Sequence, residues 1–362
     1  MDIRDAAPLD ETTLHPVRFT GNWREYFGIW IVNVLLTVVT FGIYSAWAKV
    51  RRMRYFHGHT EIAGNSLQYQ GDPVRILIGR IIAFGILVVY NVMLEVAPFV
   101  GLALLGVLIF AFPFFIQRSI RFNARVTSWR NVHFDFHGTY WGAFVIYILG
   151  GVMVIVTGFL TVPLVSKWTW RYVMNNLSYG GRPFEADPSA GAMYRAAVIP
   201  ILLIISASVM TVVLIVAMQA VYPDMSNLMR DGFEEIMTSG LGILLIGFYA
   251  LLVFFYLLIG AIYRAGVRNA GISATTIDGR HALTSAMNRF KYAWIILSNL
   301  VVTLLTLGLA RPWAAVRAYR YGAETITLTT TGSLDDYVNQ VESSGAALGD
   351  AYMDIDGVDF GL

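Results

Sequence analysis

The sequence predicts an all-α polytopic integral membrane protein, and three observations carry this prediction. Of the 362 residues, 56% are hydrophobic and only 14% are charged, whereas a soluble globular protein has roughly 45–50% apolar and about 25% charged residues. The mean hydropathy is +0.59. Seven apolar segments approach or exceed the length of about 20 residues that an α-helix needs to cross a bilayer.

These seven segments are spaced along the whole chain. They lie at residues 26–44, 76–94, 97–116, 140–165, 196–221, 241–262 and 292–310. Most of the nine Trp residues lie near the ends of these segments, where an indole ring can sit at the level of the lipid headgroups. So many segments of spanning length are not typical of the buried helices of a soluble protein.

The distribution of Lys and Arg between the segments separates them into two groups. If all seven segments cross the membrane, the two sides receive 11 and 13 of these residues, which indicates no orientation. If only the second, third, fifth and sixth segments cross, as two hairpins, the loops at 95–98 and 222–240 together hold one Arg and the other side holds 23 Lys and Arg. Because cytoplasmic loops are enriched in Lys and Arg, we expect four spans and a cytoplasmic position for both ends of the other three segments.

The first, fourth and seventh segments also belong to a repeated unit. Residues 33–55 align with residues 299–321 without a gap, and a weaker middle copy is in register with them. The aromatic positions of the repeat motif are Trp47, Tyr55, Tyr172, Trp313 and Tyr321. Because internal repetition constrains the fold more than a single motif does, we predict three internal repeats at about 23–72, 129–187 and 276–332.

Each repeated unit has the pattern of a broken helix. An apolar helix reaches a Gly- or Pro-containing break, such as residues 40–42, and an amphipathic helix with a basic end follows, at residues 45–55 in the first copy. Two arrangements remain open. The units either re-enter on the cytoplasmic side, or they are three full spans with the middle copy inverted, as in many transporters.

Short polar segments with period-two character adjoin the repeated units. Those at 60–69, 129–136, 176–184 and 325–331 predict short strands, which we expect to form a small cytoplasmic β layer. The predicted organisation is a polar N-terminal segment at 1–22, a membrane domain at 23–332 and an acidic C-terminal tail at 333–362. Since this tail carries acidic residues and no Lys or Arg, we expect it to be solvated.

Three groups of side chains are candidate site residues. The basic residues expected to bind an anion or a lipid headgroup are Arg51, Arg54, Arg80, Arg171, Arg317 and Arg320. The polar residues within apolar segments, which are pore-lining candidates, are Asn33, Asn91 and Asn299. The paired imidazoles that are weak metal candidates are His57, His59, His133 and His137. Neither His pair has a third ligand at a recognisable spacing, so we predict no metal site.

Several short sequence motifs of the chain are shared with a known family. They are residues 47–55 with His59 and Thr60 after them, 123–129, 175–180, 312–317 and the ending 360–362. On these motifs the chain resembles the bacterial YjgN-like inner-membrane family, a family of unknown function, from about Val17 to the C-terminus. The resemblance implies a multi-pass protein of the bacterial cytoplasmic membrane and implies no reaction.

Other function classes are disfavoured by the sequence. The chain has 26 Lys and Arg against 24 Asp and Glu, without a basic block, so we expect no nucleic-acid partner. With no Cys, it has no disulfide, thiolate ligand or Cys nucleophile. Neither a phosphate-binding glycine loop nor a Ser-His-Asp or His-Glu-x-x-His motif is present. We therefore expect neither an enzyme nor a bound cofactor.

The leading functional hypothesis is transport or permeation of a small solute, with an anionic solute favoured by the arginines. The alternative is a non-transporting membrane scaffold or lipid-binding protein, in which the same arginines hold anionic headgroups. A weaker alternative is a metal-responsive sensor that uses the histidines. Membrane lipids are the expected partners in the first two hypotheses, and the sequence predicts neither the solute nor the oligomeric state.

Overall fold

The computed structural model describes residues 12–221 and 240–341. Its helices are α1 (Trp23–Val39), α2 (Ser45–Gly58), α3 (Pro73–Val96), α4 (Pro98–Arg125), α5 (Tyr140–Phe144), the π-helix η1 (Val145–Leu149), α6 (Gly150–Val156), α7 (Val162–Asn175), α8 (Ala190–Val221), α11 (Gly240–Ile272), α12 (Arg289–Leu305) and α13 (Arg311–Glu324). Its strands are β1 (Thr12–Pro16), β2 (Arg18–Phe19), β3 (Thr60–Ile62), β4 (Asn65–Tyr69), β5 (Thr127–Trp129), β6 (Val132–Phe136), β7 (Leu177–Tyr179), β8 (Arg182–Ala186), β9 (Thr275–Ile277), β10 (His281–Ser285) and β11 (Ile326–Thr331).

These elements repeat one unit five times. In each unit a pair of helices runs out from the sheet and back, and strands follow. The units begin with α1, α3, α5, α8 and α12, and the three repeats predicted from the sequence correspond to the first, third and fifth units. The second helix of each unit packs against the first helix of the next, and α13 packs against α1. The helix pairs therefore form a closed ring.

Every unit begins with a capping residue. In the first, second, third and fifth units the side chains of Asn22, Asp72, Thr139 and Asn288 accept a hydrogen bond from a backbone N–H in the first helical turn. In the fourth unit Ser189 does the same for Ala192 at 3.1 Å. Such short polar side chains satisfy backbone donors that have no partner within the helix, so the sequence defines where each helix pair leaves the sheet.

The strands form a single antiparallel sheet of 11 strands. Their order is β1-β11-β10-β9-β8-β7-β6-β5-β4-β3-β2. The two strands at the ends of this order, β1 and β2, belong to one segment, and Val17 between them donates a hydrogen bond to the carbonyl of Ile326 at 3.0 Å. The sheet is therefore nearly closed on itself. The prediction of an all-α protein with only a small β layer is wrong.

The physical reason for this error is the brevity of the strands. Four hairpins each join a strand of three residues to a strand of five residues, and such short polar runs give little periodic signal. Their turns contain two residues with positive φ, for example Ala63 (φ 48°) and Gly64 (φ 76°), or Asp278 (φ 55°) and Gly279 (φ 62°). Turns of this geometry match the twist of antiparallel strands.

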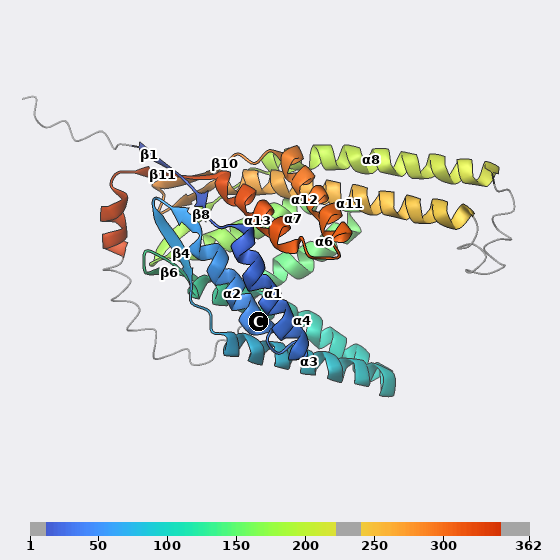
Figure 1. Ribbon diagram of the computed structural model, residues 1–362, viewed down its shortest axis with the longest axis horizontal. Coiled ribbons are helices and arrows are strands. Elements are labelled where there is room, and N and C mark those ends of the chain that lie inside the picture. The colour runs from blue at the N-terminus through green and yellow to red at the C-terminus, as the bar shows by residue number, and fades with distance from the viewer. Residues whose placement is uncertain (1–11, 222–239, 342–362) are drawn as a thin grey trace, which may run out of the picture.

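In the described part of the chain, four helices are long and apolar enough to cross a membrane. They are Pro73–Val96, Pro98–Arg125, Ala190–Ala217 and Gly242–Ile272, and they correspond to the second, third, fifth and sixth apolar segments. As Figure 1 shows, the pairs α3/α4 and α8/α11 extend furthest from the strands, which lie together at one end of the molecule. Among the described residues, the loop charge argument thus selects the same four helices as length and hydropathy do.

The other three helix pairs are shorter and turn back before that length. Their turns carry pairs of positive-φ residues at Phe41 and Gly42, at Gly158 and Phe159, and at Leu307 and Gly308. In the first turn the N–H of Gly42 bonds to the carbonyl of Thr37 at 2.7 Å, which satisfies a helix-terminal carbonyl. Phe41 and Leu307 at the turn tips are 98% and 94% exposed. Apolar tips of this kind are suited to contact with lipid tails.

The described part of the acidic tail is not free in solvent. Residues 334–341 are helical and lie against the inside of the sheet. Val338 and Val341 are 2% and 0% exposed, in a cluster with Trp129, Tyr179 and Phe184. The expectation of a solvated tail therefore does not hold for these residues, and the tail beyond residue 341 lies outside the described residues.

Candidate functional site

The nearly closed sheet surrounds a cavity of about 910 Å³. This volume is within the range of roughly 300–1,000 Å³ that is usual for ligand sites. The side wall of the cavity consists of strand residues. Residues of α2, α4, α11, α12 and α13 line the end of the cavity nearest the helix pairs, and Leu334 and Tyr337 of the tail helix line the opposite end.

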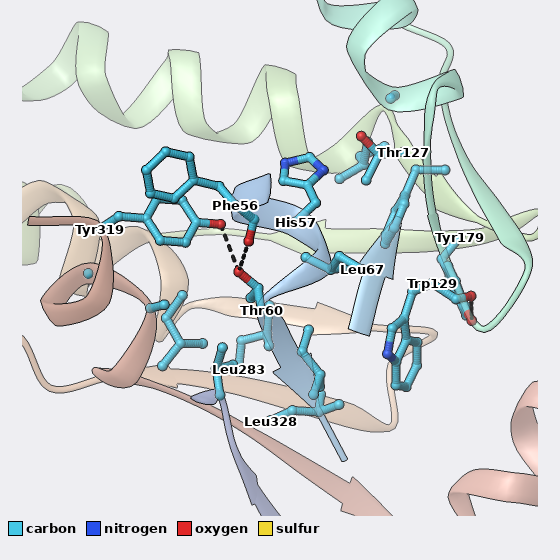
Figure 2. A pocket seen from close by; sticks show the side chains of 18 of the residues that line it. Phe56, His57, Thr60, Leu67, Thr127, Trp129, Tyr179, Leu283, Tyr319 and Leu328 are labelled. Carbon is cyan, nitrogen blue, oxygen red and sulfur yellow. Dashed lines mark hydrogen bonds between the residues drawn. The ribbon is translucent and has the colours of Figure 1, made fainter. Parts of the chain in front are cut away.

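Alternating residues of the strands point into this cavity. The first and third residues of β3, β5, β7 and β11 line it: Thr60 and Ile62, Thr127 and Trp129, Leu177 and Tyr179, Ile326 and Leu328. From the five-residue strands, the central residues Leu67, Phe134, Phe184 and Leu283 do the same. Figure 2 shows several of these side chains converging, with the Thr60 hydroxyl donating to the Phe56 carbonyl (2.7 Å) and 3.0 Å from the Tyr319 hydroxyl. Because strand side chains alternate between faces, the inner surface is mostly apolar.

Two arginines lie among these apolar residues, and no Asp or Glu lies in the described lining. Arg268 of α11 donates to the hydroxyls of Ser285 (3.3 Å) and Thr325 (3.1 Å) and to the carbonyl of Gly322. Arg52 of α2 is exposed and lies over the ring of Phe56, with 5.8 Å from its Cζ to the ring centroid. Neither guanidinium forms an ion pair within the described chain. Among the described residues, no carboxylate at the cavity compensates the positive charge of these two guanidinium groups.

Three polar atoms at the cavity wall lack a hydrogen-bond partner in the described structure. They are His57 Nδ1, His281 Nε2 and the Tyr337 hydroxyl. Burial lowers the pKa of both imidazoles, so both favour the neutral form, and burial raises the pKa of Tyr337 to about 12. Buried polar groups usually have a partner, so the cavity wall offers three polar atoms that are free to bond to whatever occupies the cavity.

The arginines predicted from the sequence do not line this cavity. Arg317 donates to Ser298 Oγ at 2.7 Å and to Asn299 Oδ1 at 3.0 Å, and Arg320 donates to the Gly21 carbonyl at 2.7 Å. Arg80 donates to Ser45 Oγ, and Arg171 forms an ion pair with Asp187 at 3.5 Å.

The remaining two predicted arginines differ in their contacts. Arg51 lies over the ring of Tyr44 at 5.8 Å, and Arg54 is exposed. Arg317 and Arg320 share a smaller hollow of about 340 Å³ that is also lined by Trp23, Trp294 and Trp313.

The three pore-lining candidates lie elsewhere as well. Asn299 is buried and its amide donates to the Ala314 carbonyl at 2.9 Å, so it joins α12 to α13. Asn33, its equivalent in the first unit, is buried and its Oδ1 has no partner in the described structure. Asn91 is exposed on α3 and donates to the carbonyl one turn before it. None of the three lines the cavity.

The candidate histidines are not brought together. His57 lies in α2 at the cavity, whereas His59 caps that helix and lies 3.7 Å from Glu25. His133 bonds to the Arg125 carbonyl, and His137 lies 3.5 Å from Asp135. No group of three or more His, Asp or Glu that could hold a metal occurs in the described residues.

The residues that the sequence reasoning missed are Arg52, Arg268, His281 and Tyr337. Arg52 was overlooked because Trp47, Val50 and Arg54 share one face of α2 and Arg52 lies on another. Arg268 and Tyr337 lie outside the three predicted repeats, and His281 lies near the start of the third one, before the aligned residues 299–321. A four-residue motif in the sequence does indicate that the second unit belongs to the repeat. An aromatic residue, a variable residue, Gly and a capping residue precede each of the first three helix pairs, as Phe19-Thr-Gly-Asn22, Tyr69-Gln-Gly-Asp72 and Phe136-His-Gly-Thr139.

These features define a class of protein: a multi-pass membrane protein in which apolar helix pairs surround and close a ligand-sized, positively charged cavity in a strand ring. The family model described as bacterial protein of unknown function (DUF898) matches residues 14–355. The chain belongs to this family.

Named relatives agree with this assignment. The inner membrane protein YjgN of Salmonella typhimurium is 26% identical over 344 residues, which cover 83% of this chain and 85% of that protein. The inner membrane protein YjgN of Escherichia coli K12 is 30% identical over 142 residues, covering 37% of this chain and 35% of that protein. No solved structure matches the chain. The protein is a multi-pass protein of the bacterial inner membrane.

Proposed function

We propose that the protein binds an amphiphile with an anionic head, such as a fatty acid or a lipid phosphate, in the cavity inside the sheet. The observation that carries this proposal is the composition of the wall. Apolar side chains dominate it, Arg52 and Arg268 supply positive charge, and the described lining contains no carboxylate. Such a wall suits an acyl chain together with a carboxylate or phosphate.

The unpartnered atoms support the same ligand. The Tyr337 hydroxyl is a donor at neutral pH, and neutral His281, whose Nδ1 accepts from the N–H of Thr331 at 3.4 Å, can donate from Nε2. These two groups can therefore bond to oxygen atoms of a ligand at the tail-helix end of the cavity. Membrane lipids are then the partner of this protein. We place the sheet on the cytoplasmic side, because the loops joining the helix pairs at that end hold almost all of the Lys and Arg. The proposal contains no catalytic step.

Binding of labelled palmitate to the purified protein tests the proposal, with hexadecanol as the uncharged probe of equal chain length. We expect saturable palmitate binding that is stronger than hexadecanol binding. Arg52→Met should weaken palmitate binding about tenfold, which equals about 1.4 kcal/mol, and leave hexadecanol binding unchanged. Arg51→Met, at the adjacent residue outside the cavity, is the matched control and should bind palmitate normally. Equal binding of both probes to the wild type would contradict the proposal.

Transport, the leading hypothesis from the sequence, has a separate readout. In proteoliposomes that contain a fluorescent phosphatidate analogue, chemical quenching from outside reports movement of the probe between the leaflets. Movement that is faster with wild type than with Arg52→Met would add transport to binding. The same rate with both proteins and with protein-free vesicles would leave a binding role alone.

A further inference from the structure

The helix at residues 334–341 lies across one end of the cavity. Leu334 and Tyr337 face the cavity, and Val338 and Val341 are buried in the cluster with Trp129 and the other apolar strand residues. These four positions have the i, i+3, i+4, i+7 spacing of one helix face. The opposite face, which includes Asp335 and Asp336, is exposed.

This helix depends on its contacts for stability. Isolated helices shorter than about 12–15 residues are marginal in water, and the described part of this one has eight residues. It follows Gly332, whose φ is +80°, a backbone conformation that glycine adopts readily. The chain therefore bends between β11 and the helix at a residue that can change conformation easily.

Charge complementarity positions the start of the helix. Asp335 forms an ion pair with Arg130, at 2.7 Å from its Oδ1 to Arg130 Nη1, and its side chain is 77% exposed. Arg130 lies in the turn between β5 and β6, and two more arginines, Arg182 and Arg280, stand at or beside the turns of the next two hairpins. Arg182 pairs with Asp278 at 3.8 Å, so the ion pair of Arg130 with Asp335 is the charged contact that joins the rim to the described helix.

Two polar groups in the contact between the helix and the sheet lack a hydrogen bond. The ring of Tyr337 packs edge-on against His281 at 4.4 Å between centroids, yet neither the Tyr337 hydroxyl nor His281 Nε2 has a partner in the described structure. Unpaired buried polar groups lower the stability of a packed arrangement. Undocking of the helix would expose both atoms to water, which lowers the free energy required for release.

We infer that helix 334–341 is a removable plug that closes the sheet end of the cavity. When docked, it separates the inner face of the strands from water. When it leaves, the cavity opens to the aqueous phase, so the plug regulates entry and exit of the amphiphile at the site described under the proposed function. The regulatory role rests on that proposed function, whereas the closure itself does not require a ligand.

The absence of Cys from the chain permits a direct test on the full-length protein. Leu283→Cys places a thiol inside the cavity, and Thr284→Cys places one at the next residue, which is exposed and faces away from it. Each is labelled with a water-soluble maleimide in detergent, alone and together with Val341→Asp. A carboxylate at this fully buried position destabilises docking. Val338→Cys, in the same two backgrounds, reports whether the helix has left.

We expect Leu283→Cys to react slowly in the parent protein and at least about tenfold faster with Val341→Asp, because a helix that is docked nine-tenths of the time shields a side chain about tenfold. Val338→Cys should gain reactivity in parallel, and Thr284→Cys should react at one rate in both backgrounds. Arg130→Gln, which removes the ion pair without a buried charge, should give a smaller increase.

Three results would overturn the inference. Leu283→Cys could react as fast as Thr284→Cys in the parent, so that nothing closes the cavity. Val338→Cys could stay unreactive with Val341→Asp, so that the helix is a fixed wall. Finally, Val338→Cys could become reactive while Leu283→Cys does not, so that the helix leaves without opening the cavity. Because labelling needs no ligand, failure of palmitate binding would refute the proposed function and leave this test intact.

Discussion

The hydroxyl of Tyr55 accepts a hydrogen bond from the backbone N–H of Asn22 and donates one to the carbonyl of the same residue, both at 2.7 Å. Tyr321 forms the same pair of bonds with Asn288, at 2.9 Å and 3.2 Å. Tyr172 donates to the Thr139 carbonyl at 2.9 Å. The two partners are 33 residues apart in all three units. The repeated Tyr thus joins the end of the second helix to the capping residue that starts the first.

Replacing these tyrosines by Phe removes the bonds and keeps the ring. We expect Tyr55→Phe and Tyr321→Phe to lower the free energy of unfolding by about 1–2 kcal/mol each, because both partner backbone groups lose a bond. Tyr172→Phe should cost less, since one bond is lost. Thermal unfolding in detergent measures the effect. Tyr256→Phe, at a side chain that is 76% exposed, is the control, and an equal loss in this variant would contradict the role assigned to the repeated Tyr.

Arg317 and Arg54 should respond differently to replacement by Lys. Arg317 donates from Nη1 to two side chains of α12, Ser298 and Asn299, and its guanidinium lies over the Trp313 ring at 5.1 Å. Lys is shorter and lacks the planar group that stacks on this ring. We expect Arg317→Lys to lower the free energy of unfolding by about 1 kcal/mol. Arg54 has no hydrogen bond or ion pair with the described residues, so Arg54→Lys should match the wild type. If Arg54→Lys and Arg317→Lys lower the free energy of unfolding equally, the hydrogen bonds of Arg317 are not the cause of the loss.

Acid should weaken the fold through His281. Burial holds the pKa of His281 below its ordinary value of 6.5, with Asp278 raising it, Arg280 lowering it and the Tyr337 ring packed against it. The unfolded chain therefore binds more protons than the folded one below about pH 6.5, and the free energy of unfolding falls as the pH falls through this range. Above about pH 7.5 His281 is neutral in both states and contributes no pH dependence.

Unfolding at several pH values for wild type and His281→Asn isolates this contribution. The difference in stability between the two proteins should be constant above pH 7.5 and should change below about pH 6.5, as the wild type alone loses the contribution. His133→Asn, at an exposed residue, is the control. Parallel curves for wild type and His281→Asn over the whole range would exclude His281 as the source.

Gly180 should tolerate Ala less well than Gly279 does. Both have positive φ, +53° and +62°, so the backbone strain of the substitution is similar. A Cβ at Gly180 would lie 2.1 Å from Val341 Cγ1 and 2.7 Å from Val132 Cγ1, whereas nothing lies within 4 Å of one at Gly279. We expect Gly180→Ala to speed labelling of Leu283→Cys and Gly279→Ala to leave it unchanged. Identical rates in the two variants would show that the rim does not hold the tail helix.

The sheet should lie wholly on the cytoplasmic side. Single cysteines at the exposed residues Gln68, His133, Thr284 and Ser333 should resist an impermeant thiol reagent applied to intact cells and react in inverted vesicles. Phe41→Cys, at the apolar tip of the first helix pair, should react slowly in both, because lipid surrounds it. Labelling of His133→Cys alone from outside would instead support an inverted middle unit.

The sequence predicted the membrane helices well because their signal is strong. The pairs α3/α4 and α8/α11 carry long apolar segments, and the loop charges separate them from the shorter pairs. The π-helix η1 and the short helix α6 gave a weaker pattern, so the middle repeat was harder to align. The sequence did not reveal the units of α3/α4 and α8/α11 as repeats, because they lack the Trp and Arg positions of the repeat motif. They share with the other units only the capping residues and the hairpins.

The cavity could not be predicted from the sequence. Leu67, Phe134, Phe184 and Leu283 lie at the centres of four short strands that are far apart in the sequence, and only the closure of the sheet brings them together. Arg52 and Arg51 are adjacent, and which of them faces the cavity depends on the rotation of α2 about its axis. The role of residues 334–341 was obscured by their acidic surroundings, although four apolar residues there have helical spacing.

The pairing of β1 with β11 determines when the sheet can be completed during synthesis of the chain. Strand β1 leaves the ribosome early, but its partner β11 ends at Thr331. Strand β1 therefore stays unpaired while roughly 300 further residues are made, which at about 5–20 residues per second takes on the order of 15–60 s. Meanwhile the backbone groups along its unpaired edge are open to mispairing with other nascent chains. The molecule therefore reaches its final topology only after translation is almost complete, when the first-made segment meets the last.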